Sequence, residues 1–314
     1  MAEILKNVPL SEYTTYKIGG PAKYLAEARN ESDIVEILGE YKTHFPNKKI
    51  FILGGGANVL FSDEGYDGLV LKISMSEIKL ADEGIVEIGA GTNLEDAVNF
   101  VAENNLSGME WAAGIPGSFG GAIRGNAGAF GGEMKDVIIS VRSVAIQEPN
   151  KVIERGNKEN MFGYRTSVFK SKARDEIILS GEIKLTSGKT DDIWEKMSKN
   201  LSYRKEKQPV ELPSAGSTFK NIPALNISEE QKKKWKDKVK TDPMPVIPAA
   251  VLISEAGLVR RTVGGAQISE KHPNFFVNTG GATAEDVKNL IAIAKETVKE
   301  KFGIDLEEEI QIVD

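Results

Sequence analysis

The chain has 314 residues, and single hydrophobic cores tend to divide above about 250–300 residues, so two or three packed units are expected. A formal net charge of −6 argues against nucleic acid as the main partner, because binding a phosphate backbone needs a basic surface. The absence of cysteine excludes thiol catalysis, iron–sulfur clusters, zinc ribbons and disulfides, and no metal site is predicted. No apolar run approaches the roughly 20 residues that span a bilayer, and the N-terminus lacks the apolar core of a signal peptide. We therefore expect a cytoplasmic protein without membrane insertion.

Short apolar runs alternate with helical repeats over the first ninety residues. Residues 24–28 are expected to form a strand, followed by a helix capped by Ser32, because apolar residues then recur at helical spacing. Residues 49–53 are apolar and end in three glycines, which predicts a buried strand that leads into a turn. Two further strands are expected at residues 69–73 and 85–89.

The next segments predict one more helix and then a change to β-rich sequence. Thr92 and Glu95 have the spacing of a capping box, so a helix is expected to begin at Thr92. Residues 137–185 contain short β-rich segments with turns between them, which predicts a small mixed sheet. The helix after the capping box is expected to bury a stripe formed by Leu94, Ala97, Val98 and Val101.

A helix is expected near residues 193–207, and the polar, proline-containing residues 205–215 that follow indicate a domain boundary. The last helix is expected at about 284–302 and should end at Gly303. The lysine-rich run 231–240 is predicted to be a solvated helix face, which is commoner than a binding site. The apolar face of the last helix is expected to consist of Val287, Leu290, Ile291, Ala294 and Val298.

Two segments are unusually rich in small residues, and both follow probable strand ends. Glycine lets a ligand touch the backbone, and consecutive N–H groups in such turns can enclose a diphosphate. Tight turns would explain one such segment, whereas two of them about sixty residues apart favour an anionic cofactor. Neither contains a Walker loop or a dinucleotide fingerprint, so spacing alone identifies no cofactor. The segments are Gly54-Gly55-Gly56-Ala57-Asn58-Val59-Leu60 and Gly114-Ile115-Pro116-Gly117-Ser118-Phe119-Gly120-Gly121-Ala122, the second continued by Gly125-Asn126-Ala127-Gly128-Ala129.

These segments, together with Ile18-Gly19-Gly20-Pro21-Ala22, resemble the FAD-binding motifs of the UDP-N-acetylenolpyruvoylglucosamine reductases. The motifs follow the family's order from about residue 8 to the C-terminus. The resemblance implies a mixed α/β (α+β) fold whose N-terminal part is a FAD-binding domain of the vanillyl-alcohol-oxidase type. Ala57 and Ser118 stand where serine and threonine are usual in the family, so main-chain donors are expected to hold the phosphate there.

The resemblance also implies that FAD is bound non-covalently and reduced by NADPH. Covalent attachment in this superfamily uses a histidine or a cysteine, and neither His44 nor His272 lies in a glycine segment. The expected FAD-binding residues are Ile18, Gly19, Gly54, Gly55, Gly56, Ala57, Asn58, Val59, Gly114, Ile115, Pro116, Gly117, Ser118, Gly120, Gly121, Asn126, Ala127 and Gly128.

Three further segments resemble the family's catalytic motifs. Arg165 is expected to bind the substrate carboxylate through its planar guanidinium. Ser217 is expected to be the general acid, and Glu309 is expected to stabilise or protonate the enol intermediate. Lys220 and Asn221 are expected to contact the UDP part of the substrate. The matching segments are Gly163-Tyr164-Arg165-Thr166-Ser167, Ala215-Gly216-Ser217-Thr218-Phe219-Lys220-Asn221 and Gly303-Ile304-Asp305-Leu306-Glu307-Glu308-Glu309-Ile310.

The implied reaction is ping-pong: NADPH reduces FAD and leaves, and the UDP-sugar substrate then takes its place. Hydride passes from flavin N5 to C3 of the enolpyruvyl group while Ser217 protonates C2. The product would be UDP-N-acetylmuramate, a precursor of peptidoglycan, which links the protein to cell wall biogenesis, cell shape and cell division. The expected partners are small molecules, NADPH and the UDP-sugar, and the protein is expected to be a monomer.

The motif order also implies a division of the chain. Some family members carry an extra tyrosine-bearing loop before the catalytic serine. Here only residues 187–207, mostly helical, fill that interval, so the chain resembles the subgroup without the loop. The expected parts are FAD-binding lobes at 1–70 and 71–187, a helical connection at 188–207 and an α+β substrate domain at 208–314.

Two other functions stay open at this point. An oxidase of the same fold would pass electrons to oxygen, although its members often tether FAD and no tether is visible here. A non-catalytic nucleotide-binding protein would keep the glycine segments but leave Arg165, Ser217 and Glu309 scattered in the folded chain.

Overall fold

The computed structural model describes residues 3–45, 49–241 and 244–314, which form two compact units that we describe separately. The chain passes from unit 1 to unit 2 between Gly55 and Gly56, inside the first glycine segment. Among the described residues, no helix is both long and apolar enough to cross a membrane. Unit 1 takes the described residues within 1–8, 22–55 and 67–202, and unit 2 takes those within 9–21, 56–66 and 203–314.

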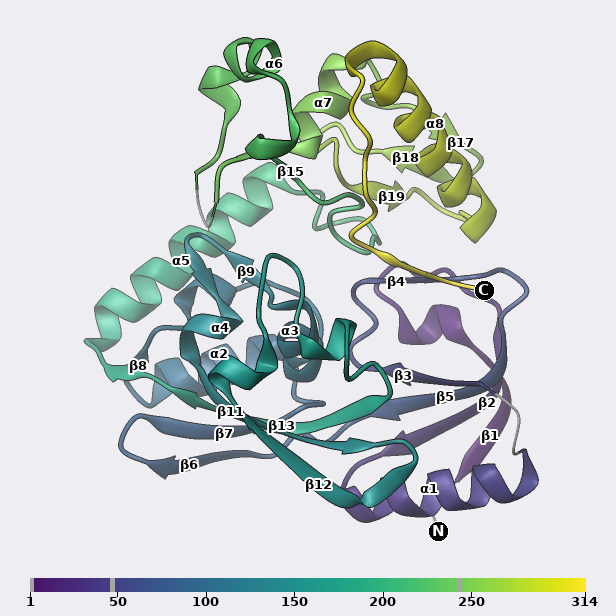
Figure 1. Cartoon of the computed structure of the whole chain (residues 1–314), viewed down its shortest axis with the longest axis vertical. Helices are drawn as coiled ribbons and strands as arrows, with labels where there is room; N and C mark the ends of the chain where they lie inside the picture. Colours follow the sequence, from purple (N-terminus) through teal and green to yellow (C-terminus); the bar gives the residue numbers. More distant parts are fainter. Residues whose placement is uncertain (1–2, 46–48, 242–243) are drawn as a thin grey trace. The chain divides into compact units, whose positions relative to one another are not determined.

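Unit 1 contains a four-stranded sheet with helix α1 (Glu31–His44) beside it (Figure 1). The strand order is β1 (Ile4–Pro9), β2 (Pro21–Ala28), β5 (Tyr66–Ile73) and β3 (Lys49–Leu53), and β3 pairs in parallel with β5. Helix α1 connects β2 to β3, which confirms the predicted strand–helix–strand order. Strand β1 was not predicted, because its side chains are mostly exposed and form no apolar run.

The cap of α1 differs from the prediction. The side chain of Asn30, rather than that of Ser32, accepts the N–H of Asp33 at 2.9 Å. The Ser32 hydroxyl donates to the same Asn30 oxygen. The Ser32 cap is therefore wrong, because the helix begins at Glu31 and makes Asn30 the capping position.

The second sheet of unit 1 is antiparallel at each described pairing of its five strands. Its order is β12 (Glu148–Gly156), β11 (Ile138–Ala145), β13 (Glu176–Lys184), β7 (Ile85–Gly89) and β6 (Ile78–Asp82). The predicted mixed sheet is therefore wrong. Strands β11 and β12 are separated by only residues 146–147, and such a short connection requires antiparallel pairing.

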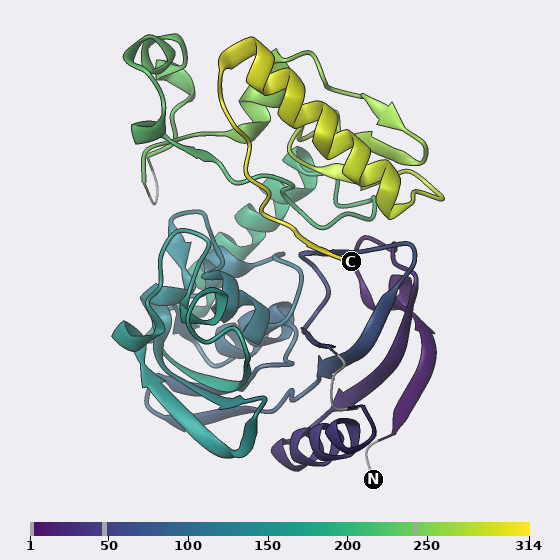
Figure 2. The ribbon, with the colours of Figure 1, turned by 45° about the vertical axis from the view of Figure 1, so that its right-hand side comes forward.

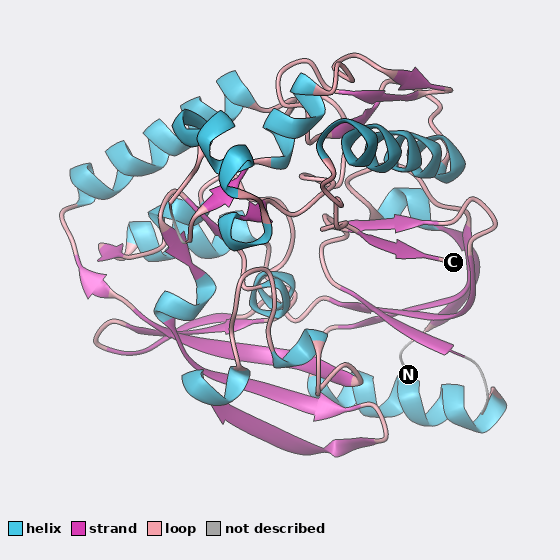
Figure 3. Cartoon of the chain, turned by 45° about the horizontal axis from the view of Figure 1, so that its top comes forward, coloured by secondary structure: helices cyan, strands magenta, loops and turns pink. Residues whose placement is uncertain are grey.

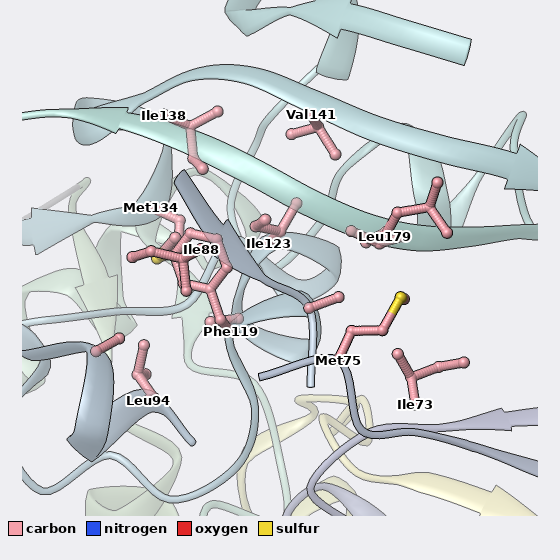
Figure 4. Packing of buried hydrophobic residues seen from close by; sticks show 14 of the residues in the cluster. Ile73, Met75, Ile88, Leu94, Phe119, Ile123, Met134, Ile138, Val141 and Leu179 are labelled. Atoms are coloured by element: carbon pink, nitrogen blue, oxygen red, sulfur yellow. The ribbon is translucent and has the colours of Figure 1, made fainter. Parts of the chain in front are cut away.

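Helices α2 (Leu94–Glu103) and α3 (Phe119–Gly125) complete this layer of unit 1, with α3 packed on β7 and β13 and α2 packed on α3. Figure 4 shows Phe119 and Ile123 of α3 among Ile88, Ile138 and Leu179 of the sheet. Both α3 side chains are fully buried. The predicted stripe of α2 is confirmed, since its four members, Leu94, Ala97, Val98 and Val101, are all buried.

The start of α2 also differs from the prediction. Asn93 is the N-cap, and its side chain accepts the N–H of Glu95 at 3.1 Å. The capping box from Thr92 is therefore wrong. The chain is fixed at this point by the second glycine segment, because the N–H of Leu94 donates to the carbonyl of Gly117 at 2.9 Å.

Short elements complete unit 1. Strand β8 (Leu106–Ser107) pairs with β14 (Thr186–Ser187), and β9 (Gly128–Ala129) pairs with β10 (Gly132–Glu133), which leads into α4 (Met134–Val137). Helix α5 (Thr190–Lys207) confirms the helix predicted near 193–207, begins three residues earlier and passes into unit 2 at Tyr203.

Unit 2 is built around helix α8 (Ala284–Phe302) and the sheet of β17 (Thr262–Val263), β18 (Ala266–Ile268) and β19 (Phe276–Asn278). Figures 2 and 3 show α8 along this sheet. The predicted ending is confirmed, because Gly303 follows with φ +67°. The predicted apolar face is also confirmed, with Val287, Leu290, Ile291, Ala294 and Val298 buried.

The remaining elements of unit 2 include the C-terminal strand β20 (Gln311–Val313), which pairs in parallel with β4 (Val59–Phe61) just after the first glycine segment. Strand β15 (Ile222–Pro223) pairs with β16 (Val246–Ile247), followed by α7 (Ala249–Glu255). In the lysine-rich run, α6 (Glu229–Lys234) ends before Trp235, which is buried and donates to Glu255 at 3.1 Å.

Candidate active site

The two glycine segments meet within unit 1. The hydroxyl oxygen of Ser118 accepts the backbone N–H of Gly55 at 3.2 Å and that of Gly121 at 3.3 Å. With both acceptor positions of Ser118 engaged, its hydroxyl hydrogen is available to donate elsewhere. The buried side chain of Ser118 therefore joins the two glycine segments by hydrogen bonds.

Glycine is required where the segments meet. A Cβ atom on Gly55 would lie 2.6 Å from the Cα of Gly117, and one on Gly54 would overlap the Ser118 hydroxyl. Gly114 and Gly117, on either side of Ile115 and Pro116, have φ of +72° and +111°. Such positive values disfavour residues other than glycine at these two positions. These glycines allow the two segments to pack closely, and beside the contact Gly55 is exposed and Gly117 half-buried, so backbone is accessible to a ligand such as the diphosphate of FAD.

The first N–H groups of α3 are bonded within the protein, although the glycines there suggested a ligand site. The N–H groups of Phe119 and Gly120 donate to the carbonyls of Thr92 and Ala90, both at 2.8 Å, and Gly121 donates to Ser118 as described above. A Cβ atom on Gly120 would lie 2.8 Å from the Cβ of Ala90. Gly120 therefore serves close packing within the protein.

Six of the predicted FAD-binding residues lie in unit 2, and the larger side chains among them mostly pack within the protein. Ile18 and Val59 are 3% and 4% exposed and lie in the core, so only their backbone could reach a ligand. Gly19 and Gly56 have φ of +136° and +65°. A Cβ on Gly56 would overlap the carbonyl oxygen of Tyr13. Of the remaining two, Ala57 is half-buried and Asn58 is exposed.

The side chain of Asn126 is used entirely within unit 1. Its Nδ2 donates to the carbonyl of Gly163 at 3.0 Å and to Oε2 of Glu133 at 3.3 Å, and its Oδ1 accepts the N–H of Lys135 at 3.0 Å. The residue is fully buried with φ +43°. Of the residues that follow, Ala127 donates to the carbonyl of Ala122, and Gly128 lies in β9.

Arg165 lies in a tight turn of unit 1. The turn is closed by two backbone hydrogen bonds between Gly163 and Thr166, at 3.0 and 3.2 Å. Arg165 is its third residue and has φ +55°, a conformation that usually selects glycine or asparagine there. The guanidinium lies 5.5 Å from the ring centre of Tyr164, and Lys170 donates to the Arg165 carbonyl at 3.0 Å. Such strain persists only where surrounding contacts fix it.

The segments that carry Ser217 and Glu309 are paired in unit 2. The N–H of Glu309 donates to the carbonyl of Thr218 at 2.8 Å, and Phe219 bridges to Glu308 in antiparallel fashion. This register places Thr218 directly opposite Glu309, with Ser217 as its neighbour along the strand. The structure therefore brings two predicted catalytic segments together, whereas Arg165 belongs to unit 1.

Asn58 joins the first glycine segment to the Glu309 segment. Its side chain donates to the carbonyl of Glu309 at 3.0 Å, and its own carbonyl accepts the N–H of Gln311 at 3.0 Å. The neighbouring glutamates form ion pairs, Glu307 with Lys220 and Glu308 with Lys295. The backbone of Glu309 is thus held from both sides.

The two predicted substrate contacts also have partners in unit 2. Lys220 pairs with Glu307, as noted, and its N–H donates to the carbonyl of the same residue at 2.9 Å. The side-chain oxygen of Asn221 accepts the N–H of Ala249, the first residue of α7, at 3.2 Å.

Sequence reasoning gave no role to Asn274, which the structure places beside the Ser217 segment. Its side chain is 2% exposed, accepts the N–H of Phe219 at 3.0 Å and donates to the Phe219 carbonyl at 2.8 Å. The one available signal was a polar asparagine directly before an apolar run.

Comparison with known proteins identifies the family. A family model described as "UDP-N-acetylenolpyruvoylglucosamine reductase, C-terminal domain" matches residues 208–313, and a FAD binding domain model matches residues 22–147. A UDP-N-acetylenolpyruvoylglucosamine reductase of Caldanaerobacter subterraneus subsp. tengcongensis is 39% identical, with 100% of this chain and 96% of the relative covered. The chain belongs to the UDP-N-acetylenolpyruvoylglucosamine reductase family.

Further matches extend over the same length. The reductase of Bacillus licheniformis is 38% identical over 100% of this chain and 95% of its own. The solved structure of the reductase from Thermus caldophilus has a TM-score of 0.78 and 30% identity, covering 100% of this chain and 99% of that one. The family and the mixed α/β fold with a FAD-binding domain, both predicted from the motifs, are confirmed.

We expect the stability of this family member to depend on pH through His272. Burial, with a smaller effect from the charge of Lys240, lowers the pKa of His272 from 6.5 to about 4. Its ring meets Phe275 edge-on, and within the described residues its Nδ1 has no hydrogen-bond partner. The unfolded chain binds the proton below about pH 6.5. Stability is therefore complete above that pH and falls as the pH is lowered towards 4.

Replacing His272 with phenylalanine is expected to remove that loss and keep the ring contact with Phe275. The fall in unfolding free energy between pH 7 and pH 4 should shrink by up to about 3 kcal/mol relative to the unmodified protein. Urea unfolding of both proteins at several pH values measures the difference. Parallel pH profiles would contradict the assignment.

Proposed function

We propose that this chain catalyses the NADPH-dependent reduction of UDP-N-acetylglucosamine enolpyruvate to UDP-N-acetylmuramate. The observation that carries the proposal is the backbone pairing of the Ser217 and Glu309 segments in a chain matched over its full length by reductases of that name. The reaction makes the protein an oxidoreductase of peptidoglycan synthesis, and hence of cell wall biogenesis, cell shape and cell division.

The residues around Gly55, Gly117 and Ser118 would hold FAD without a covalent bond. The backbone of Gly55 is exposed beside their contact, and the Ser118 hydroxyl, which accepts two N–H groups, has a hydrogen left to donate. FAD supplies the hydride-transfer chemistry, after reduction by NADPH. The main-chain dipoles of this chain would hold the cofactor in position.

Three residues would act on the substrate. Arg165 binds the enolpyruvyl carboxylate, because its guanidinium stays charged and matches a carboxylate with two hydrogen bonds. Ser217 gives a proton to C2, and Glu309 in its protonated form stabilises or protonates the enol intermediate.

Several finer points belong to the same proposal. Lys220 and Asn221 would lie near the UDP part of the substrate. FAD-binding lobes at 1–70 and 71–187, with a connection at 188–207, would serve the cofactor, and residues 208–314 would serve the substrate. We also propose that the protein is a cytoplasmic monomer of the subgroup without the tyrosine-bearing loop, since α5 fills most of that interval.

Product analysis tests the proposed reaction. The protein loaded with FAD is given NADPH and the enolpyruvyl sugar, and the sugar is analysed by mass spectrometry. We expect one NADPH consumed for each sugar, a product heavier by two hydrogens and no hydrogen peroxide. Unchanged sugar with peroxide equal to the NADPH consumed would instead favour an oxidase.

A further inference from the structure

Two buried asparagines make hydrogen bonds that resemble those of a neighbouring strand. A carboxamide carries both a donor and an acceptor, so it can pair with a backbone as another peptide group would. Asn126 in unit 1 and Asn274 in unit 2 are 0% and 2% exposed. Each bonds to the backbone two residues from a proposed catalytic side chain.

Asn126 holds the turn of Arg165. It donates to the carbonyl of Gly163, the residue at which the turn begins. The same turn is tied by Lys170 to the Arg165 carbonyl and by the Ser167 hydroxyl to the Arg124 carbonyl at 2.8 Å. Because φ of Arg165 is +55°, the turn needs external contacts to keep this shape.

The other contacts of Asn126 orient its carboxamide for the hydrogen bond to Gly163. Glu133, which is 4% exposed and paired with Lys135, accepts from the second hydrogen of the carboxamide. The N–H of Lys135 donates to the carboxamide oxygen of Asn126. With both donor hydrogens and the oxygen engaged inside the protein, the Asn126 side chain supports the turn rather than a ligand.

Asn274 holds the segment that carries Ser217. Its carboxamide donates to the carbonyl of Phe219 and accepts the N–H of the same residue. Its own carbonyl accepts the N–H of Thr218 at 2.7 Å, and the next residue, Phe275, bridges to Ser217. The backbone on both sides of Ser217 is thereby fixed to one buried residue and its neighbour.

We propose that Asn126 and Asn274 are positioning residues, the first for Arg165 and the second for Ser217. This inference rests on the proposed function, and it assigns each asparagine a separate consequence. Loss of the Asn126 contact should weaken binding of the substrate carboxylate. Loss of the Asn274 contact should slow proton transfer from Ser217 and leave binding of the sugar unchanged.

The aspartate variants Asn126→Asp and Asn274→Asp test this, because each keeps the shape of the side chain and removes its donor hydrogens. Three quantities are measured on the FAD-loaded protein. They are the Kd of the enolpyruvyl sugar, from the change it causes in the oxidised flavin spectrum, the rate of flavin reduction by NADPH, and the rate of reoxidation at saturating sugar.

Asn126→Asp is expected to raise the Kd by about tenfold or more, as for a weakened charge-assisted contact. Asn274→Asp is expected to slow reoxidation by about a hundredfold, as for a proton donor displaced by about 1 Å, with an unchanged Kd. Neither should alter reduction by NADPH. Asn126→Gly, which suits the positive φ, and Asn274→Ala repeat the test if a buried carboxylate prevents folding.

A matched control makes the same chemical change elsewhere in unit 1. Asn104, just after α2, donates to the carbonyl of Phe100 at 2.8 Å. Asn104→Asp should leave all three quantities unchanged. Equal losses in all three for the test variants, or wild-type values of Kd and reoxidation, would overturn the proposal. Absence of reoxidation by the sugar in the unmodified protein would overturn the proposed function instead.

Discussion

Replacing Ser217 with alanine is expected to slow reoxidation of the reduced flavin by the enolpyruvyl sugar by about 10²- to 10⁴-fold, the usual contribution of a general acid. Reduction of the flavin by NADPH should keep its rate, because that half-reaction needs no proton from Ser217. The segment that carries Ser217 is held by bridges to Phe275 and Glu308, so removal of one hydroxyl should leave the fold intact. Rapid mixing under anaerobic conditions measures the two half-reactions separately.

Ser214→Ala is the matched control for this variant. Ser214 lies three residues earlier in the same segment and makes one weak contact through its hydroxyl, with the N–H of Gly216 at 3.4 Å. Its variant should reproduce both wild-type rates. Equal slowing of the two half-reactions in Ser217→Ala would remove Ser217 from the role of proton donor.

The second large effect is expected from Gly55→Ala, which should yield a protein that purifies without yellow colour. The new Cβ would lie 2.6 Å from the Cα of Gly117 and 2.7 Å from the N of Ser118, so the two glycine segments must separate. Overpacking of this kind costs about 1–3 kcal/mol, which corresponds to a rise of about fivefold to 150-fold in the Kd of FAD if the whole cost falls on the FAD-bound form. Fluorescence titration of the apoprotein with FAD measures that Kd.

Gly39→Ala is the control for Gly55→Ala, because it makes the same substitution where a new Cβ meets no other atom. Gly39 is exposed in α1, and a Cβ there would meet nothing within 4 Å. This variant should bind FAD normally and gain up to about 1 kcal/mol of stability from helix propensity. A yellow Gly55→Ala protein with wild-type affinity for FAD would show that the contact between the segments is not the FAD cradle.

The regular elements were largely predictable because side-chain periodicity determines them. The spacing of apolar residues identified α8 and its buried face, and the apolar run before Gly54 identified β3. Strand β1 escaped because its exposed side chains leave no such pattern.

The helix caps could not be fixed in the same way. Asn30 and Ser32 are both good capping residues two positions apart, and only the position of the first helical residue decides between them. At α2, the bond from Leu94 to Gly117 decides the start, and that contact joins residues far apart in the sequence.

The glycine segments show the limit of composition at the candidate site. The resemblance implied that Gly120 and Gly121 bind FAD, which stays a prediction, and their N–H groups donate to Ala90 and Ser118. Glycine needed for close packing and glycine needed for a ligand look the same in a sequence. The resemblance also placed Asn126 among the FAD-binding residues, which stays a prediction, and its side-chain hydrogen bonds go to Gly163, Glu133 and Lys135.

The catalytic motifs were found by resemblance, but their pairing was not. Three successive glutamates left the choice among them dependent on a motif match alone. The register now places Glu309 opposite Thr218 and gives Glu307 and Glu308 lysine partners. Register depends on contacts between residues about ninety positions apart, which no local pattern encodes.

The visible spectrum of the FAD-loaded protein under anaerobic conditions tests the central claim most directly. Addition of NADPH should bleach the flavin absorbance, and subsequent addition of UDP-N-acetylglucosamine enolpyruvate, still without oxygen, should restore it. Bleaching that recovers only on admission of air, or a protein that binds no FAD at all, would contradict the account.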